Sequence, residues 1–282
     1  MIYTSIGTSS GSTLVDRISA LAESGLKNIE LSGGTPWYSD WENDLKSLRD
    51  TFDLQFLCHN YFPPPPTNFV LNLASLDENI YHQSITHVRN ALAFCERWQI
   101  PKYGVHAGFL VDIPTAEIGS TLTRQTLADK QQARHRFLSA LKELIALATS
   151  TQLYIENNVL SQANYQAFGQ QNPLLLVTAT DYQDLKKDLP CPLLLDIGHL
   201  KVSAQTLGLT FNDELTALMG DSDYLHLSDN DGKSDTNQLL SLGSSLWHSL
   251  KGHNLSSKTL TLEMSASAAD LSTLVRHIEH EL

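Results

Sequence analysis

Eight short apolar runs recur along the sequence, and each is followed by residues with helical spacing. Such runs have the length and composition of strands that are buried on both faces. Repeated strand–helix units indicate a parallel sheet, and eight of them in 282 residues indicate a closed (β/α)8 TIM barrel, an α/β fold formed by a single domain over residues 1–282. The expected strands are residues 2–6, 26–31, 54–59, 103–106, 153–156, 192–196, 224–226 and 259–263.

The alternative fold is an open, doubly wound sheet. That fold would carry a glycine-rich phosphate-binding turn after its first strand, and the sequence GTSSGS at residues 7–12 does not match GxGxxG. The barrel is therefore the favoured prediction. The expected helices are residues 13–24, 40–52, 77–98, 124–149, 182–189, the stretch after residue 196 to about 219, and 268–282, with the start of 161–190 expected to be loop.

The composition excludes several classes of partner. The chain has 19 Lys and Arg against 31 Asp and Glu, a formal net charge of −12, whereas proteins that grip nucleic acid need a basic surface. No apolar run approaches the roughly 20 residues that span a bilayer, and the N-terminal residues do not have the pattern of a signal peptide. Three cysteines without metal-ligand spacing fit reduced thiols. We therefore expect a cytoplasmic protein with neither a nucleic-acid nor a membrane partner.

The stretch PLLLDIGHLKVS at residues 192–203 carries the clearest functional signal. Three leucines lead into Asp196, and Gly198 and His199 begin two residues after it. A carboxylate and an imidazole three positions apart at the end of a strand can converge on one metal ion or one substrate. The alternative interpretation is that Asp196 only caps the helix that follows.

The same kind of side chain stands at the end of almost every expected strand. In a parallel barrel all of these ends lie on one face, which is where active sites are built. Unpaired charges are costly to bury, so we expect a functional cluster at this rim. Its candidate members are Glu30, His59, His106, Glu156, Asp196, His226 and Glu263.

The last four strands supply the best candidate for a metal site. Glu156, Asp196, His226 and Glu263 together offer three carboxylates and one imidazole. Such a set suits hard to borderline divalent ions, namely Mn²⁺, Mg²⁺, Co²⁺ or Zn²⁺. A site of this kind leaves coordination positions open for a water or a polyol, as catalytic metal sites do.

The strand endings also carry a resemblance to a known family. IENN, LDIGH, HLSDNDGKSD and LEMS, with HN after the third strand and VHAG after the fourth, resemble the xylose isomerase-like TIM barrel superfamily over nearly the whole chain. That superfamily includes sugar isomerases, ketose 3-epimerases, inosose dehydratases and the endonuclease IV branch. The resemblance implies an enzyme, and it leaves a homo-oligomer open.

The epimerase branch implies specific roles for these residues. One divalent metal ion would be held by Glu156, Asp196, His226 and Glu263, with Glu156 and Glu263 also acting as the acid and base on opposite faces of a sugar. The position of His199 would contact substrate hydroxyls. The reaction implied is proton transfer through an enediolate, which serves both epimerisation and aldose–ketose isomerisation.

The endonuclease branch implies three zinc ions, with His59 and His106 as additional ligands and an Asp-x-His motif after the seventh strand. This sequence has Asp235-Thr236-Asn237 there, so one strong zinc ligand is missing and we expect no complete trinuclear site. His59 and His106 are instead predicted to bind substrate. Lys233 lies near the place of an arginine in the epimerase branch, where it could contact a hydroxyl or a phosphate group, or else lie free on the surface.

Two aromatic residues and four prolines follow His59. Tyr61, Phe62 and residues 63–66 could form a rigid apolar wall against one face of a sugar, or they could pack on a neighbouring loop. The sequence does not decide between these interpretations.

The sequence as a whole favours a divalent-metal-dependent isomerase or epimerase that acts on a small sugar or sugar derivative. Three alternatives remain open at this level: a metal-dependent phosphodiesterase resembling endonuclease IV, a dehydratase of the inosose or dehydroshikimate type, and a non-catalytic sugar-binding barrel. The identity of the sugar, the native metal and the number of ions do not follow from the sequence.

Overall fold

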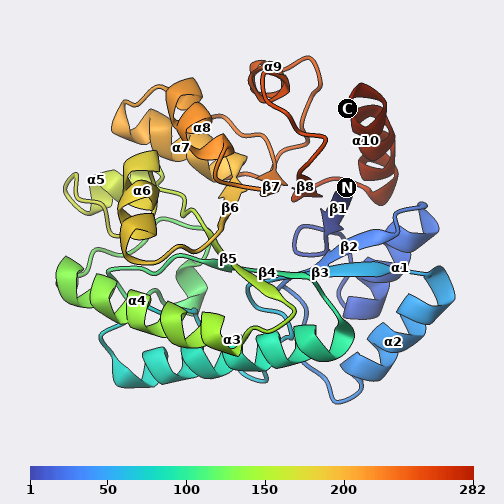
Figure 1. Ribbon diagram of the computed structural model, residues 1–282, viewed down its shortest axis with the longest axis horizontal. Helices are drawn as coiled ribbons and strands as arrows, with labels where there is room; N and C mark the ends of the chain where they lie inside the picture. The colour runs from blue at the N-terminus through green and yellow to red at the C-terminus, as the bar shows by residue number, and fades with distance from the viewer.

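The computed structural model describes residues 1–282, and its strands form a closed parallel barrel in the order β1 to β8 (Figure 1). Every strand pairs in parallel with the next one, and β8 closes the barrel against β1. The (β/α)8 prediction is therefore confirmed. The strands are β1 Ile2–Ser5, β2 Asn28–Leu31, β3 Gln55–His59, β4 Lys102–His106, β5 Gln152–Glu156, β6 Leu193–Asp196, β7 Tyr224–Leu227 and β8 Thr259–Leu262.

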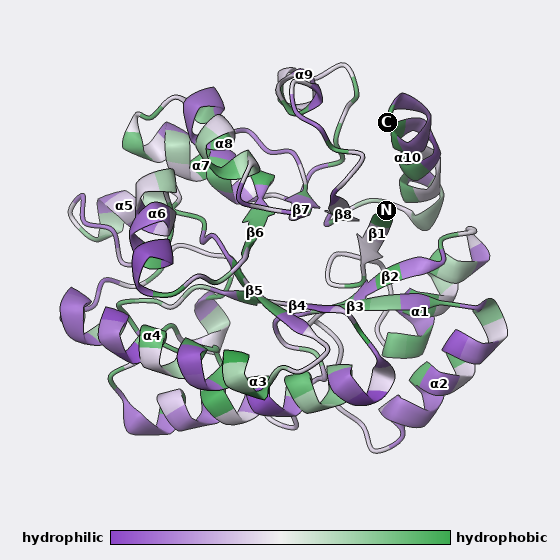
Figure 2. Cartoon of the chain, viewed as in Figure 1, coloured by the Kyte–Doolittle hydropathy of each residue, from purple (hydrophilic) through white to green (hydrophobic).

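Helices surround the barrel on its outside (Figure 1). They bury apolar residues against the strands and carry hydrophilic residues elsewhere, so they show both colours in Figure 2. The helices are α1 Leu14–Glu23, α2 Trp41–Phe52, α3 Glu78–Trp98, the 3₁₀ turn η1 Thr115–Glu117, α4 Lys130–Leu147, α5 Gln162–Ala167, α6 Ala179–Asp188, α7 Ile197–Leu207, α8 Phe211–Met219, α9 Ser245–Lys251 and α10 Ala268–Glu281.

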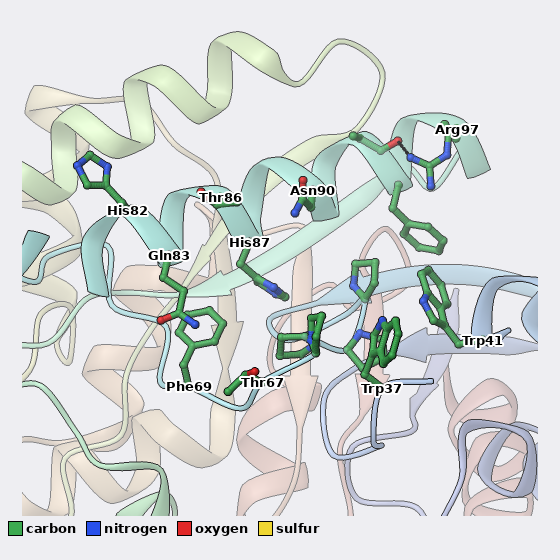
Figure 3. A pocket seen from close by; sticks show the side chains of 16 residues that line it. Trp37, Trp41, Thr67, Phe69, His82, Gln83, Thr86, His87, Asn90 and Arg97 are labelled. Carbon is green, nitrogen blue, oxygen red and sulfur yellow. Dashed lines mark hydrogen bonds between the residues drawn. The ribbon is translucent and has the colours of Figure 1, made fainter. Parts of the chain in front are cut away.

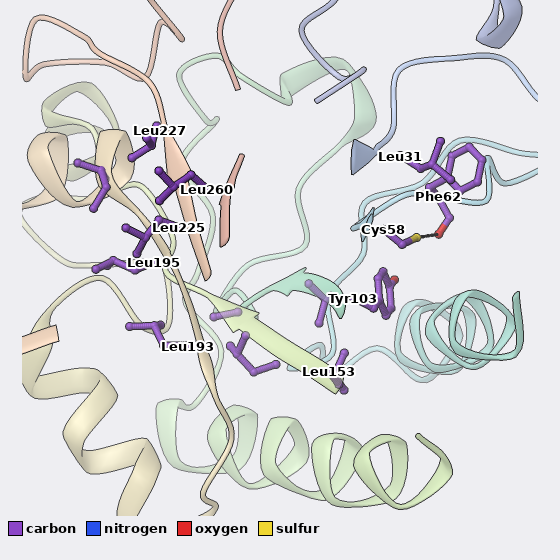
Figure 4. Close-up of a cluster of buried hydrophobic side chains, with 14 of the residues drawn as sticks. Leu31, Cys58, Phe62, Tyr103, Leu153, Leu193, Leu195, Leu225, Leu227 and Leu260 are labelled. Carbon is purple, nitrogen blue, oxygen red and sulfur yellow. Dashed lines mark hydrogen bonds between the residues drawn. The ribbon is translucent and has the colours of Figure 1, made fainter. Parts of the chain in front are cut away.

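The main apolar core lies between the strands and the helices. On β6, Leu193 and Leu195 point outward into this core and are fully buried (Figure 4). Leu194, between them, points to the barrel interior, where it belongs to a separate apolar cluster. The three leucines thus fill both faces of the strand, as a continuous apolar run predicts.

The barrel interior is built in two layers. The lower layer is the apolar cluster of Tyr3, Leu57, Tyr154, Leu194 and Tyr224, all of them buried. Side chains two residues apart along a strand lie on the same face, so the next inward residue on four of these strands is a candidate site residue. The successive pairs are Leu57 and His59, Tyr154 and Glu156, Leu194 and Asp196, and Tyr224 and His226.

Gly104 on β4 makes room for this arrangement. A Cβ atom at that position would lie 2.5 Å from Leu194 Cδ2 and 3.1 Å from His59 Cδ2. The first contact is too short for real side chains, and the second would require the imidazole to shift slightly. The absence of a side chain at Gly104 therefore lets a large apolar residue of the lower layer and an imidazole of the upper layer share the barrel interior.

The structure corrects three expectations about the helices. Residues 124–129 are not helical, because Asp129 caps α4 by accepting a hydrogen bond from Gln132 N. Residues 162–167 form the short helix α5, in a stretch that was expected to be loop, and none of its residues is buried. The helical stretch after residue 196 is two helices, since Gly208 ends α7 with a φ of 69°.

None of the helices combines the length and the apolar composition that a membrane span requires.

Candidate metal centre

The four predicted ligands meet at the carboxyl-terminal rim of the barrel. Glu156, Asp196 and His226 are the last or next-to-last residues of β5, β6 and β7, and Glu263 follows β8 directly. One side-chain oxygen or nitrogen from each of the four lies within 4.8 Å of those of the others. Residues separated by more than one hundred positions in sequence therefore present donor atoms to one common point.

His226 Nδ1 is at the centre of this group. It lies 2.8 Å from Glu263 Oε2, 3.3 Å from Glu156 Oε1 and 3.8 Å from Asp196 Oδ2. Glu156, Asp196 and His226 are buried, whereas the Glu263 side chain is 17% exposed. The cluster is thus enclosed on the barrel side and open on the side of Glu263.

A second group shares Glu156 with the first. His59 Nε2 lies 2.7 Å from Glu156 Oε2, and His106 Nδ1 lies 3.4 Å from the same oxygen. Donor atoms of His59, His106 and Glu156 lie within 4.8 Å of one another. The two oxygens of Glu156 therefore face two different sets of side chains.

The residues of the first group fit a divalent metal ion. Neither Glu156 Oε1 nor His226 Nδ1 makes a hydrogen bond of normal geometry, although both atoms are buried. Buried polar atoms without partners are uncommon and call for an explanation. Three carboxylates and one imidazole that converge on one point would be satisfied by a cation, and this donor set suits Mn²⁺, Mg²⁺, Co²⁺ or Zn²⁺.

The electrostatics of the group differ from one carboxyl to the next. Burial would raise the pKa of Glu156, but the charges of His106 and His59 hold this pKa well below its ordinary value. Burial likewise opposes ionisation of Glu263, and contact with His226 nevertheless lowers the pKa of Glu263 to about 2. Burial raises the pKa of Asp196 to about 7, against the opposing charge of His199. Two glutamates are thus held ionised beside a more basic aspartate.

Asp196 caps a helix, as one interpretation of its sequence expected, and it also faces the candidate cluster. Its Oδ1 accepts a hydrogen bond from His199 N at 2.6 Å and caps α7, while its Oδ2 faces His226. The residue at position 198, between Asp196 and His199 in the sequence, has to be glycine, because a Cβ there would lie 2.4 Å from Ser228 Oγ and 3.3 Å from Asp196 Oδ1. One carboxylate therefore starts a helix with one oxygen and faces the cluster with the other.

His199 lies beside the cluster. Its Nδ1 is 2.8 Å from the carbonyl oxygen of Asn157, and its Nε2 is 3.3 Å from Asp235 Oδ2. The Asp235-Thr236-Asn237 segment thus places the carboxylate of Asp235 next to His199. The sequence interpretation treated that segment only as an incomplete zinc motif and missed this contact.

A cavity of about 410 Å³ opens beside these residues. His106 and Lys233, two of the residues expected to bind substrate, line it together with Asp235, whereas His199, which was also expected to do so, does not. His59 does not line it, because its side chain is enclosed and only 4% exposed. The lining is thus mixed, since ionisable groups stand together with the apolar residues Val70, Phe109, Ile113, Ile118, Leu122, Val159 and Leu174.

The aromatic and proline segment divides between two surroundings. Tyr61 lines the cavity, but Phe62 is fully buried and packs edge-on against Trp41. Residues 63–66 line a separate outer groove of about 740 Å³ with Trp37 and one face of α3 (Figure 3). Of the segment that the sequence suggested as an apolar wall, only Tyr61 lines the cavity, because Phe62 packs into the core and residues 63–66 line the outer groove.

Glu30 has a role that the sequence did not define. It was expected at the rim, and the structure places it against the far side of the His226 ring, with Oε2 3.0 Å from His226 Nε2. The signal in the sequence was a glutamate between the apolar residues Ile29 and Leu31 of the strand NIEL. Nothing in that strand, however, indicates which histidine the carboxylate meets.

The barrel topology and the rim cluster together define a parallel (β/α)8 protein with a candidate metal centre at the active face. The sequence matches the model of the family described as "Xylose isomerase-like TIM barrel" over residues 18–264, and the chain belongs to this family. No curated protein matches the sequence at a significant level.

Several solved structures share this fold. A D-tagatose 3-epimerase-like protein superposes with a TM-score of 0.71 at 17% identity, covering 99% of this chain and 97% of that one. A 3-keto-D-glucoside 4-epimerase from E. coli gives 0.68 at 11% identity over 98% of both chains. Endonuclease IV from Thermus thermophilus gives 0.63 at 15% identity, over 100% of this chain and 99% of that one. At these identities the likeness shows the fold and not the reaction.

Proposed function

We propose that this protein is a divalent-metal-dependent isomerase or epimerase of a small sugar or sugar derivative. The observation that carries the proposal is the cluster of Glu156, Asp196, His226 and Glu263 beside a cavity that His106 and Lys233 line. The family membership and the epimerases among the structural neighbours support an enzyme of this class. A small-molecule substrate also agrees with the net charge of −12, which disfavours a polyanion.

The metal would be held by Glu156, Asp196, His226 and Glu263. When bound, a divalent ion polarises the carbonyl group of a sugar and so makes the neighbouring C–H bond more acidic.

Glu156 and Glu263 are the proposed proton carriers. Both carboxylates approach the ring of His226, at 3.3 Å and 2.8 Å, from different strands. Their lowered pKa values keep both ionised at neutral pH, so either can accept a proton from a carbon next to a carbonyl. In aldose–ketose isomerisation the carboxyl that took up the proton would return it to the neighbouring carbon. In epimerisation the second carboxyl, once protonated by solvent, would give a proton to the opposite face of the same carbon.

The remaining polar residues of the cavity would orient the sugar. His106 lies on the cluster side, and Lys233 is an exposed cation that no carboxylate pairs with. His199 and Asp235 present a charged pair between the cluster and the cavity. We assign these residues to the binding of hydroxyl groups, with Lys233 also suited to an anionic substituent.

The test is an assay for proton transfer at carbon. Protein loaded with Mn²⁺ is incubated in D₂O with a panel of ketoses, aldoses and keto-glycosides, and NMR and mass spectrometry follow deuterium uptake and product identity. Glu263→Gln should lose about 10²- to 10⁴-fold in rate. Glu143→Gln, a surface carboxylate on α4 paired with Arg89, is the matched control and should retain the wild-type rate.

The products also separate the alternatives. Isomerisation and epimerisation conserve the mass of the sugar, whereas a dehydratase would remove one water. Binding of sugars with neither deuterium exchange nor a product would indicate a non-catalytic barrel. Equal rates for Glu263→Gln and Glu143→Gln would refute the proposed proton transfer.

A second candidate function is a metal-dependent phosphodiesterase. The observation that favours it is the second group of His59, His106 and Glu156, which could hold a further ion next to the first. It predicts more than one bound ion per chain by elemental analysis and cleavage of DNA at abasic sites. One ion per chain and no cleavage would remove this candidate.

A further inference from the structure

A buried hydrogen-bond network lies beneath the candidate metal centre. Glu30 Oε2 accepts hydrogen bonds from Thr261 Oγ1 at 3.0 Å and from the hydroxyl of Tyr224, and it lies 3.0 Å from His226 Nε2. All four of these residues are fully buried. A buried carboxylate of this kind is costly unless it is well paired, so its position implies a specific use.

The network contacts the side of the His226 ring that faces away from the cluster. Nε2 meets Glu30, while Nδ1 faces Glu263, Glu156 and Asp196. When one ring nitrogen of a neutral imidazole donates its N–H to a carboxylate, the other nitrogen carries the lone pair. The contact with Glu30 thus decides which nitrogen is available as a ligand.

We propose that Glu30 is a positioning residue that holds the hydrogen of His226 on Nε2 and so presents Nδ1 to a metal ion. This inference rests on the metal site of the proposed function, but not on which sugar is converted. Thr261 and Tyr224 in turn hold the Glu30 carboxylate in place, from β8 and β7.

The other possible role of Glu30 is that of a ligand. Donor atoms of Glu30, His59 and His226 also lie within 4.8 Å of one another, so an ion could bind there through His226 Nε2. Glu30 Oε2 already contacts three partners, so the donor atom that Glu30 has left is its buried Oε1, which makes no hydrogen bond, as is also true of Glu156 Oε1. The cluster of Glu156, Asp196, His226 and Glu263 offers one donor residue more than the group around Glu30 and is therefore the better ion site. The two roles predict coordination through opposite nitrogens of the same ring.

The first test measures metal affinity without any sugar. Binding of Mn²⁺ or Zn²⁺ to the metal-free protein is followed by calorimetry or by competition with a chelator, for the wild type, Glu30→Gln and Thr261→Val. Glu30→Gln should weaken binding about 10- to 100-fold, as is usual for the loss of an outer-shell partner. Thr261→Val removes one hydrogen bond to the same oxygen and leaves the contact with His226, so it should have a smaller effect.

The second test needs no variant and holds even if Glu30→Gln fails to fold. Wild-type protein labelled with ¹⁵N-histidine and loaded with Zn²⁺ should show His226 protonated at Nε2 and coordinated through Nδ1. Coordination through Nε2, or a Glu30→Gln protein that folds and binds metal as tightly as the wild type, would overturn the proposal. Because neither test contains a sugar, failure of the proposed isomerase or epimerase activity would be recognised separately, in the deuterium-exchange assay.

Discussion

Replacing Gly104 with alanine tests how tightly the two layers of the barrel interior are packed. The new Cβ would lie 2.5 Å from Leu194 Cδ2 and 3.1 Å from His59 Cδ2, so one of these side chains must move. Overpacking of this kind costs about 1–3 kcal/mol. Alanine also loses less conformational freedom than glycine when the chain folds, and in the middle of a strand this difference stabilises the folded protein by about 0.5–1 kcal/mol. The net result should be a protein that is less stable by up to about 2.5 kcal/mol.

The double variant with Leu194→Ala makes the argument specific. Leu194→Ala alone should cost about 2–5 kcal/mol, because Leu194 is fully buried and its loss leaves a cavity. Removal of the Leu194 side chain also removes the atom that Gly104→Ala strikes, so the new methyl group can enter the cavity. The double variant should therefore be more stable than the sum of the two changes predicts, by about 0.5–3 kcal/mol.

The assay is urea unfolding of all four proteins, followed by circular dichroism, with chelator present so that metal binding does not contribute. A common m-value across the four proteins shows that the midpoints report stability. Strictly additive costs across the four proteins would refute the packing reasoning.

Three further predictions follow from other parts of the molecule. Phe62→Ala should destabilise the protein by about 3–5 kcal/mol, because Phe62 is fully buried against Trp41 and Phe94. The KM for any sugar that the protein converts should not change. A raised KM with normal stability would instead indicate that Phe62 forms part of the cavity wall. A divalent ion at one hundred times its Kd should add about 2.7 kcal/mol to the unfolding free energy in a thermal scan, and a chelator should reverse this. Glu96 accepts hydrogen bonds from residues 149–151, and those of Ser150 above all hold its pKa below the ordinary value. Its contribution to stability is therefore present above its unfolded pKa and lost as the pH falls through the lower, folded value. The gap in urea midpoint between the wild type and Glu96→Gln should accordingly narrow from pH 7 toward acid, and a constant gap would contradict this.

The strands and their order were predictable because the signal is local and repeated. Each strand is a short apolar run, and a polar residue at its end stands out against that run. Since side chains alternate along a strand, the last polar residue falls on the same face as the apolar residue two positions before it. Tyr154 and Glu156 illustrate this on β5.

The helices after β4 and β5 were less predictable because their boundaries depend on tertiary contacts. Residues 124–129 were expected to be helical but have no regular secondary structure, and Ala128 N donates a hydrogen bond to the carbonyl oxygen of Leu110. α5 has no buried residue, so it lacks the apolar period by which amphipathic helices are recognised.

Contacts between distant side chains were the hardest part to predict. The sequence placed Glu30 and His226 on the same rim, but it could not show that Glu30 lies behind the imidazole rather than beside the other ligands. The sequence also could not show that the chain turns after Tyr61 and places Phe62 in the core, because an aromatic residue suits a core and a cavity wall alike.

The apolar lower layer of the barrel has a consequence for how an ion would come and go. Tyr3, Leu57, Tyr154, Leu194 and Tyr224 close the interior beneath the cluster, so no aqueous path leads out through the opposite end. An ion at Glu156 and His226 would have to exchange with solvent through the same mouth by which the proposed sugar would enter. A sugar bound in the cavity would block this exit, so the ion should dissociate more slowly as the cavity becomes occupied.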